Sequence, residues 1–146
     1  LARRRAGHAR CLRRDRHPDH GRGATLVAEA CFLSGLRRIG SRLGEVEQEA
    51  WRPRAVYHAI QDRWIDPDLL VDITPHWVTK ERALRCFASQ FHDPESKEPQ
   101  SPISNPDFLP FLEARAREMG RLLGVTYAEG FTVARPPGVH DLLDLG

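Results

Sequence analysis

The chain has 146 residues, which is enough for one domain of ordinary size. Hydrophobic residues make up 40% and charged residues 29%, a composition typical of a globular rather than a disordered protein. No apolar run approaches the ~20 residues that cross a bilayer, and no signal-peptide segment is recognisable. We therefore expect neither a membrane protein nor a secreted precursor, and no membrane partner.

The formal net charge of +2 conceals an uneven distribution. Residues 1–16 hold seven arginines and one acid, whereas the remainder contains more acidic than basic side chains. The mildly acidic body argues against a nucleic-acid partner, and only the arginine-rich N-terminal arm could bind one. The arm lacks interleaved aromatic residues, so we expect no nucleic-acid partner. The three cysteines, Cys11, Cys31 and Cys86, form no Cys-x-x-Cys pair. We expect Cys31 and Cys86 to be reduced core residues, and a cytoplasmic protein without a disulfide framework.

Residues 1–14 show no periodicity, and we expect an irregular arm there. A helix is expected from Pro18, because proline suits a first helical turn and Asp19 complements the helix dipole. An apolar stripe follows at helical spacing. It consists of Ala24, Val27, Ala28, Cys31 and Phe32. The polar stretch Gly40–Glu49 is expected to be a loop.

Two short apolar runs, 54–60 and 68–73, are expected to be strands, the second covered on both faces. A helix is expected over about 76–91, with Leu84, Phe87, Ala88 and Phe91 on one side. A long surface loop, 92–106, should follow. Further along, Asn105 or Asp107 could cap a third helix over 106–122. Its apolar residues are Phe108, Phe111, Leu112, Met119, Leu122 and Leu123. A last strand is expected over 125–133, and an irregular tail from Arg135. Strands separated by helices indicate α/β layering.

The tetrapeptide His17-Pro18-Asp19-His20 is the most informative motif. Two imidazoles three residues apart at a helix start can lie on one side of a turn, and histidine is a common zinc ligand. Asp19 could hold an imidazole tautomer through a hydrogen bond. The plainer interpretation is a polar loop with a good helix start. Glu129 lies in an otherwise apolar strand, where it could be catalytic or simply paired with an arginine.

Six sequence blocks together resemble the LmbE/PIG-L-type zinc deacetylases, and most closely the bacillithiol biosynthesis deacetylases among them. The likeness covers about residues 15–140, and the blocks follow one another in the family's order. They are Asp15–Arg22, Glu29–Leu36, Arg52–Tyr57, Val71–Thr74, Ser89–Phe91 and Tyr127–Phe131.

The resemblance implies a Rossmann-like α/β fold, with a parallel sheet in a three-layer arrangement, and one zinc ion. It implies a hydrolase that removes the N-acetyl group of N-acetylglucosaminyl malate, and a homo-oligomer, commonly a hexamer. Carried onto this chain, His20 is a zinc ligand, His17 stabilises the oxyanion or protonates the departing amine, and Asp19 orients His17. Arg52 is a candidate substrate contact, although Trp51 replaces the histidine expected before it.

The family's His-Pro-Asp-Asp motif, which supplies two zinc ligands and the general base, is absent here. We therefore expect residues 15–146 to be the C-terminal part of one LmbE-like domain, preceded by a non-matching arm over 1–14. The chain would be the product of a truncated or frame-disrupted gene and inactive by itself. The alternative is a non-catalytic remnant that retains oligomerisation surfaces.

Overall fold

A computed structural model describes residues 17–87, 90–91, 97, 99 and 101–144. Helices and short strands are mixed along the chain, which confirms the α/β character. The chain divides into two compact units, one of them Leu70–Gly130 and the other made by the segments on either side of it. The predicted arm over 1–14 lies outside the described residues, as do Ala88, Ser89 and His92. No helix in the described ranges is long and apolar enough to cross a membrane.

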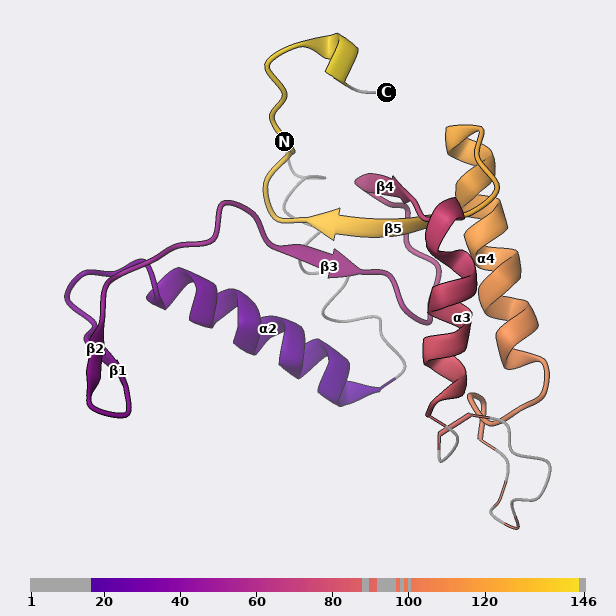
Figure 1. Cartoon of the computed structure of the whole chain (residues 1–146), viewed down its shortest axis with the longest axis horizontal. Helices are drawn as coiled ribbons and strands as arrows, with labels where there is room; N and C mark the ends of the chain where they lie inside the picture. The colour runs from indigo at the N-terminus through magenta and orange to yellow at the C-terminus, as the bar shows by residue number, and fades with distance from the viewer. Residues whose placement is uncertain (1–16, 88–89, 92–96, 98, 100, 145–146) are drawn as a thin grey trace. The chain divides into compact units, whose positions relative to one another are not determined.

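The first unit contains helix α2 (Pro18–Leu33), which begins at the residue predicted from the sequence (Figure 1). Pro18 occupies the first turn and Asp19 places a carboxylate at the positive end of the helix dipole. None of the residues of α2 is buried. The predicted stripe is half-buried at best, and the side chains of Val27 and Phe32 are 53% and 58% exposed.

The expectation of a loop over Gly40–Glu49 is wrong, because this segment forms a β-hairpin. Strands β1 (Ser41–Leu43) and β2 (Val46–Gln48) pair antiparallel, with Leu43 opposite Val46. Gly44 has a φ of 60° at the first position of the two-residue turn, a conformation that glycine adopts without strain. Both strands are exposed throughout. A strand is usually predicted from apolar residues alternating with polar ones, because one face of the strand is buried. Neither face of these strands is buried, so that signal is missing here.

The larger sheet has three strands in the order β3–β5–β4. Strand β3 (Tyr57–Ala59) pairs antiparallel with β5 (Ala128–Val133), with His58 opposite Thr132. These two side chains are buried, at 7% and 1% exposure. Strand β3 is shorter than the predicted 54–60.

Strand β4 (Leu69–Asp72) leads through a 3₁₀ turn, η1 (Thr74–His76), to α3 (Trp77–Arg85) in the second unit. Backbone bonds from Asp68 N to Phe131 O (2.9 Å) and from Ile73 N to Tyr127 O (3.0 Å) flank β4. Their order makes β4 run opposite to β5. The prediction that this strand is covered on both faces is wrong, because its residues are half-buried or exposed. The strand pairings seen here are antiparallel, so the parallel three-layer sheet stays a prediction.

Helix α4 (Phe108–Leu123) follows in the same unit and ends at Gly124, which has a φ of 74°. Its buried residues are Ala116, Met119 and Gly120. A Cβ atom on Gly120 would lie 2.7 Å from the carbonyl oxygen of Val125, so the following turn can approach the helix only because residue 120 is glycine. Ile73, Trp77 and Ala116 form the buried cluster, against which Tyr127 packs.

Several predicted core positions in this unit are wrong. Helix α3 ends at Arg85 rather than near 91, and Phe87 is 57% exposed. Cys86 is exposed, and its thiol donates a hydrogen bond to the carbonyl of Arg82. On α4, the exposed apolar residues are Phe111, Leu122 and Leu123. The predicted stripes counted large apolar residues, whereas burial also depends on which face of a helix meets another element.

Candidate functional site

The start of α2 brings His17, Asp19 and His20 together. The ring centroids of His17 and His20 are 5.6 Å apart. His17 is the N-cap residue, and its Nδ1 atom accepts a hydrogen bond from the backbone N–H of Asp19 at 3.3 Å. The histidine side chain therefore satisfies one of the amide groups that a helix start leaves without a partner.

The carboxylate of Asp19 lies between two basic groups. One carboxylate oxygen is 3.6 Å from Nδ1 of His17, and the other is 3.5 Å from a guanidinium nitrogen of Arg22. The side chains of His17 and Asp19 are 52% and 69% exposed. The cluster is thus an open surface arrangement, in which solvent weakens the ion pair between Asp19 and Arg22.

Arg52 lies at the opposite end of α2. Its Nη2 atom donates to the carbonyl of Phe32 at 3.1 Å, and its guanidinium carbon is 4.9 Å from the centre of the Phe32 ring. A cation at a helix C-terminus complements the dipole there. At 1.5 Å per residue, this contact is about 22 Å along the helix from His17. The structure therefore does not bring Arg52 together with the two histidines.

The described residues offer few side chains that could bind a metal ion together. Across 17–87, 90–91, 97, 99 and 101–144, no group of three or more His, Cys, Asp or Glu side chains could hold a metal ion. His20 can contribute one imidazole to a site whose other ligands come from elsewhere. Cys31 and Cys86 are free thiols.

Glu129 is paired, but with a lysine rather than an arginine. Its carboxylate forms an ion pair with Lys80 of α3. The Nζ atom of Lys80 also lies 5.8 Å from the centre of the Trp77 ring. These contacts give Glu129 a structural role beside the aromatic core of the second unit.

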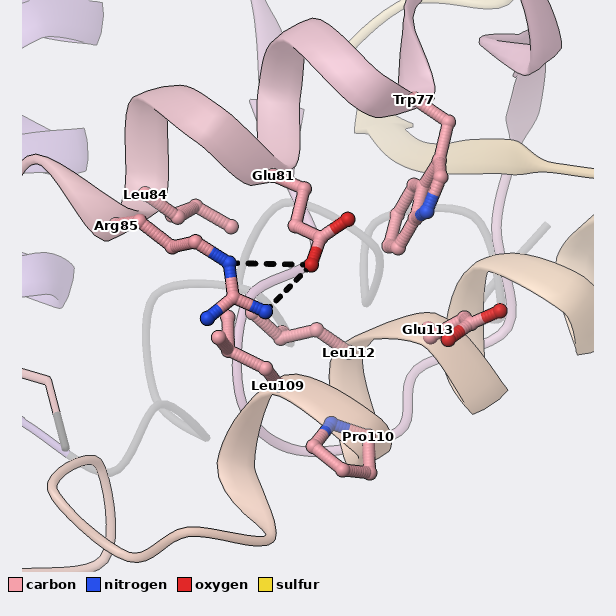
Figure 2. Close-up of a pocket in the computed structure, with 8 residues that line it drawn as sticks. All are labelled: Trp77, Glu81, Leu84, Arg85, Leu109, Pro110, Leu112 and Glu113. Carbon is pink, nitrogen blue, oxygen red and sulfur yellow. Dashed lines mark hydrogen bonds and ion pairs between the residues drawn. The ribbon is translucent and has the colours of Figure 1, made fainter.

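A small cavity of about 140 Å³ opens between α3 and α4 (Figure 2). Trp77 and Glu81 line it from α3, and Leu112 and Glu113 line it from α4. Glu81 is already bonded to Arg85, at 2.6 Å and 3.2 Å. The cavity is smaller than the ~300–1,000 Å³ of most ligand pockets, so we assign it to packing between the helices.

Beside this cavity, Glu113, Arg117 and Tyr127 form a hydrogen-bonded triad. Arg117 donates to Glu113 at 2.8 Å and to the Tyr127 hydroxyl at 2.8 Å, and that hydroxyl donates to Glu113 at 3.0 Å. The bonds from Arg117, and then from Tyr127, lower the pKa of Glu113. Burial raises the pKa of Tyr127, and its bond to Glu113 adds to this effect. The ring of Tyr127 stacks on Trp77 at 4.5 Å.

A larger pocket of about 550 Å³ lies in the first unit and was missed in the sequence. Its charged residues are Arg52, Arg54 and Arg135. The available signal was a repeated dipeptide, because Arg-Pro occurs at 52–53 and again at 135–136. The antiparallel pairing of β3 and β5 explains why these distant segments meet.

Comparison with known proteins gives a fold relative without a stated activity. No protein-family model matches the chain. The crystal structure of a conserved protein, TT1542, from Thermus thermophilus is similar, with a TM-score of 0.68 and 29% sequence identity. The likeness covers 86% of this chain and 49% of the Thermus chain. The chain thus spans about half the length of that protein.

Proposed function

We propose that the chain forms the part of a zinc-dependent N-deacetylase that carries the histidine pair at the start of α2. The substrate would be an N-acetylglucosamine conjugate such as N-acetylglucosaminyl malate, and the reaction hydrolysis of its amide. The observation that carries the proposal is the meeting of His17 and His20, with Asp19 beside them. The reaction type is taken from the resemblance of the six sequence blocks to the LmbE/PIG-L-type deacetylases.

His20 is the proposed metal ligand. Zinc, when bound, supplies Lewis-acid polarisation of the reacting groups. A catalytic zinc site normally uses three protein ligands, and no such group occurs within the described ranges. The proposal therefore places the remaining ligands and the general base outside these residues. The imidazole of His20 fits such a site, since it lies at a helix start within 5.6 Å of the second ring.

His17 is the proposed proton donor. In the neutral ring, Nδ1 accepts the N–H of Asp19, which leaves the ring proton on Nε2. The neutral Nε2–H group can donate a hydrogen bond to an amide oxygen that gains negative charge. To protonate the departing nitrogen, the ring must first take up the proton that the attacking water loses to the general base, because the neutral ring would otherwise be left as an imidazolate. When His17 takes up a second proton, its Nδ1–H can turn to the nearby Asp19 carboxylate. Asp19 is thus the proposed positioning residue for His17.

The wider arrangement belongs to the same proposal. A Rossmann-like parallel sheet in three layers would be completed by chain beyond the described residues. The likeness covers only 49% of the Thermus chain, which supports a larger whole. A homo-oligomer in the cytoplasm is part of the proposal. Because Arg52 is bound to the far end of α2, its proposed substrate contact would serve a group about 22 Å from the histidines, or another ligand.

A second candidate is a non-catalytic remnant that retains oligomerisation surfaces. The exposure of α2 favours it, because a 16-residue helix without a buried residue offers an apolar surface to a partner. Large exposed side chains on this helix are Leu26, Val27, Phe32 and Leu33.

Zinc stoichiometry and acetate release, measured side by side, separate the two candidates. The purified chain is assayed alone and fused to the half of the Thermus protein that has no counterpart here. We expect weak or no zinc and no deacetylation of N-acetylglucosaminyl malate from the chain alone, and one zinc per fused chain with acetate release. A folded fusion that oligomerises without zinc or activity would support the remnant instead. Activity of the chain alone would refute the requirement for external ligands.

A further inference from the structure

The 550 Å³ pocket in the first unit combines a cationic lining with a size suited to a small molecule. The described residues that line it include three arginines and no aspartate or glutamate. None of these arginines forms an ion pair with another described residue, although ion pairs do hold Arg22, Arg42 and Arg85 elsewhere. Within the described part of the chain, three formal positive charges therefore line one pocket without a carboxylate to neutralise them.

Two of the three guanidinium groups are held in place by backbone bonds. Nη2 of Arg52 donates to the carbonyl of Phe32 at 3.1 Å, and Nη2 of Arg135 donates to the carbonyl of Arg54 at 3.0 Å. A guanidinium has five N–H donors, so each group keeps most of its donors for a ligand. The side chain of Arg54 makes no hydrogen bond with the described residues and is the most available of the three.

The remaining wall is rigid and partly apolar. Pro53, Pro136 and Pro137 line the pocket, and proline fixes the backbone φ angle without offering an N–H. Tyr57 and Phe32 add aromatic surface. A wall of this kind can hold the carbon body of a ligand while the guanidinium groups bind its charged end.

We infer that this pocket binds a small organic molecule carrying a doubly charged oxyanion, either a phosphoryl group or a dicarboxylate. Guanidinium forks match the paired oxygens of both groups. The site is separate from the histidine pair, because it lies at the opposite end of α2. Because Arg52 is also the proposed substrate contact and malate is a dicarboxylate, the dicarboxylate reading rests on the proposed function. The test below follows a cysteine of the pocket rather than zinc or acetate, so its failure is distinguishable from failure of the proposed deacetylase.

Alkylation of Cys31 provides a test within a single molecule. This thiol lines the pocket, whereas the Cys86 thiol is exposed in the other unit. A bound anion should cover Cys31 and shield it from the reagent. Alkylation by iodoacetamide, a neutral reagent, is followed at each cysteine by mass spectrometry. Inorganic phosphate and succinate are the probes, and acetate and chloride at equal ionic strength are the controls.

We expect phosphate, succinate or both to slow alkylation of Cys31 in a saturable, concentration-dependent way and to leave Cys86 unchanged. Protection by phosphate alone would identify a phosphoryl ligand, and by succinate alone a dicarboxylate. Arg54→Gln should remove the protection without disturbing a described bond, whereas the charge-matched Arg63→Gln, outside the pocket, should retain it. Equal protection by chloride, protection that survives Arg54→Gln, or none from either dianion would overturn the inference.

Discussion

Helices α2 and α4 have the same length of 16 residues and differ in burial. Helix α4 buries three residues, and one of them, Ala116, lies in a cluster with Ile73 and Trp77. Helix α2 buries none; His17 caps its start, and Arg52 donates to a carbonyl of its last turn. The comparison shows that an apolar stripe predicts a helix but not the element that covers it.

The largest expected effect comes from truncating a buried side chain on α4. Met119 is 2% exposed, so Met119→Ala should lower the free energy of unfolding by about 2–5 kcal/mol through lost burial and a new cavity. Val27 on α2 is 53% exposed, and Val27→Ala should change the free energy of unfolding by less than about 0.5 kcal/mol. Urea unfolding followed by helical circular dichroism measures both. Equal losses for the two variants would break the comparison.

A matched pair of glycines sharpens the same contrast. A Cβ at Gly120 would lie 2.7 Å and 2.8 Å from the carbonyl oxygens of Val125 and Thr126. A Cβ at Gly23 would meet no atom within 4 Å. Gly120→Ala should therefore destabilise by about 1–3 kcal/mol. Gly23→Ala should stabilise by up to about 1 kcal/mol, because alanine favours the helix. Thermal melting of both variants gives the signs, and a stabilising Gly120→Ala would contradict the close approach.

The smallest expected effect is a pH dependence confined to the second unit. Because its bonds lower the pKa of Glu113 in the folded chain, Glu113 stabilises the fold above its unfolded pKa. That contribution is lost as the pH falls through the lower, folded pKa. Glu113→Gln should flatten the dependence of unfolding between about pH 5 and 3. Glu29→Gln, at an exposed position on α2, should not. If the free energy of unfolding fell equally with pH in the wild type and in Glu113→Gln, the triad would not stabilise the ionised form of Glu113.

Local sequence signals predicted the start of α2 and the end of α4, but not the end of α3, which comes six residues earlier than expected. Pro18 and Asp19 predicted the start of α2, and the structure ends α4 at Gly124, close to the predicted end at 122. Asp107, one of the two predicted caps, occupies the N-cap position of α4, but its side chain makes no capping hydrogen bond. Asn105, the other, accepts the backbone N–H of Asp107 at 2.8 Å just before the helix. These features depend on a few neighbouring residues, which explains why they can be predicted from the sequence alone.

Features that depend on distant contacts were not predictable in the same way. Trp77 was not singled out, yet it is buried because Tyr127, fifty residues later, stacks on it. The 550 Å³ pocket in the first unit requires the pairing of β3 with β5, which brings Arg54 and Arg135 together. Within the candidate site, the meeting of His17 and His20 follows from helical spacing. The position of Arg52 does not, because it depends on where the chain returns to α2.

The central claim is that His17 and His20 have different roles at one site. The fused protein described above, with His17→Ala or His20→Ala, tests it most directly when bound zinc and acetate release are measured on the same samples. The account predicts that His20→Ala loses both zinc and activity, and that His17→Ala keeps zinc but loses activity by about 100-fold or more, as expected for a proton donor. Full zinc occupancy without His20, or full activity without His17, would contradict it.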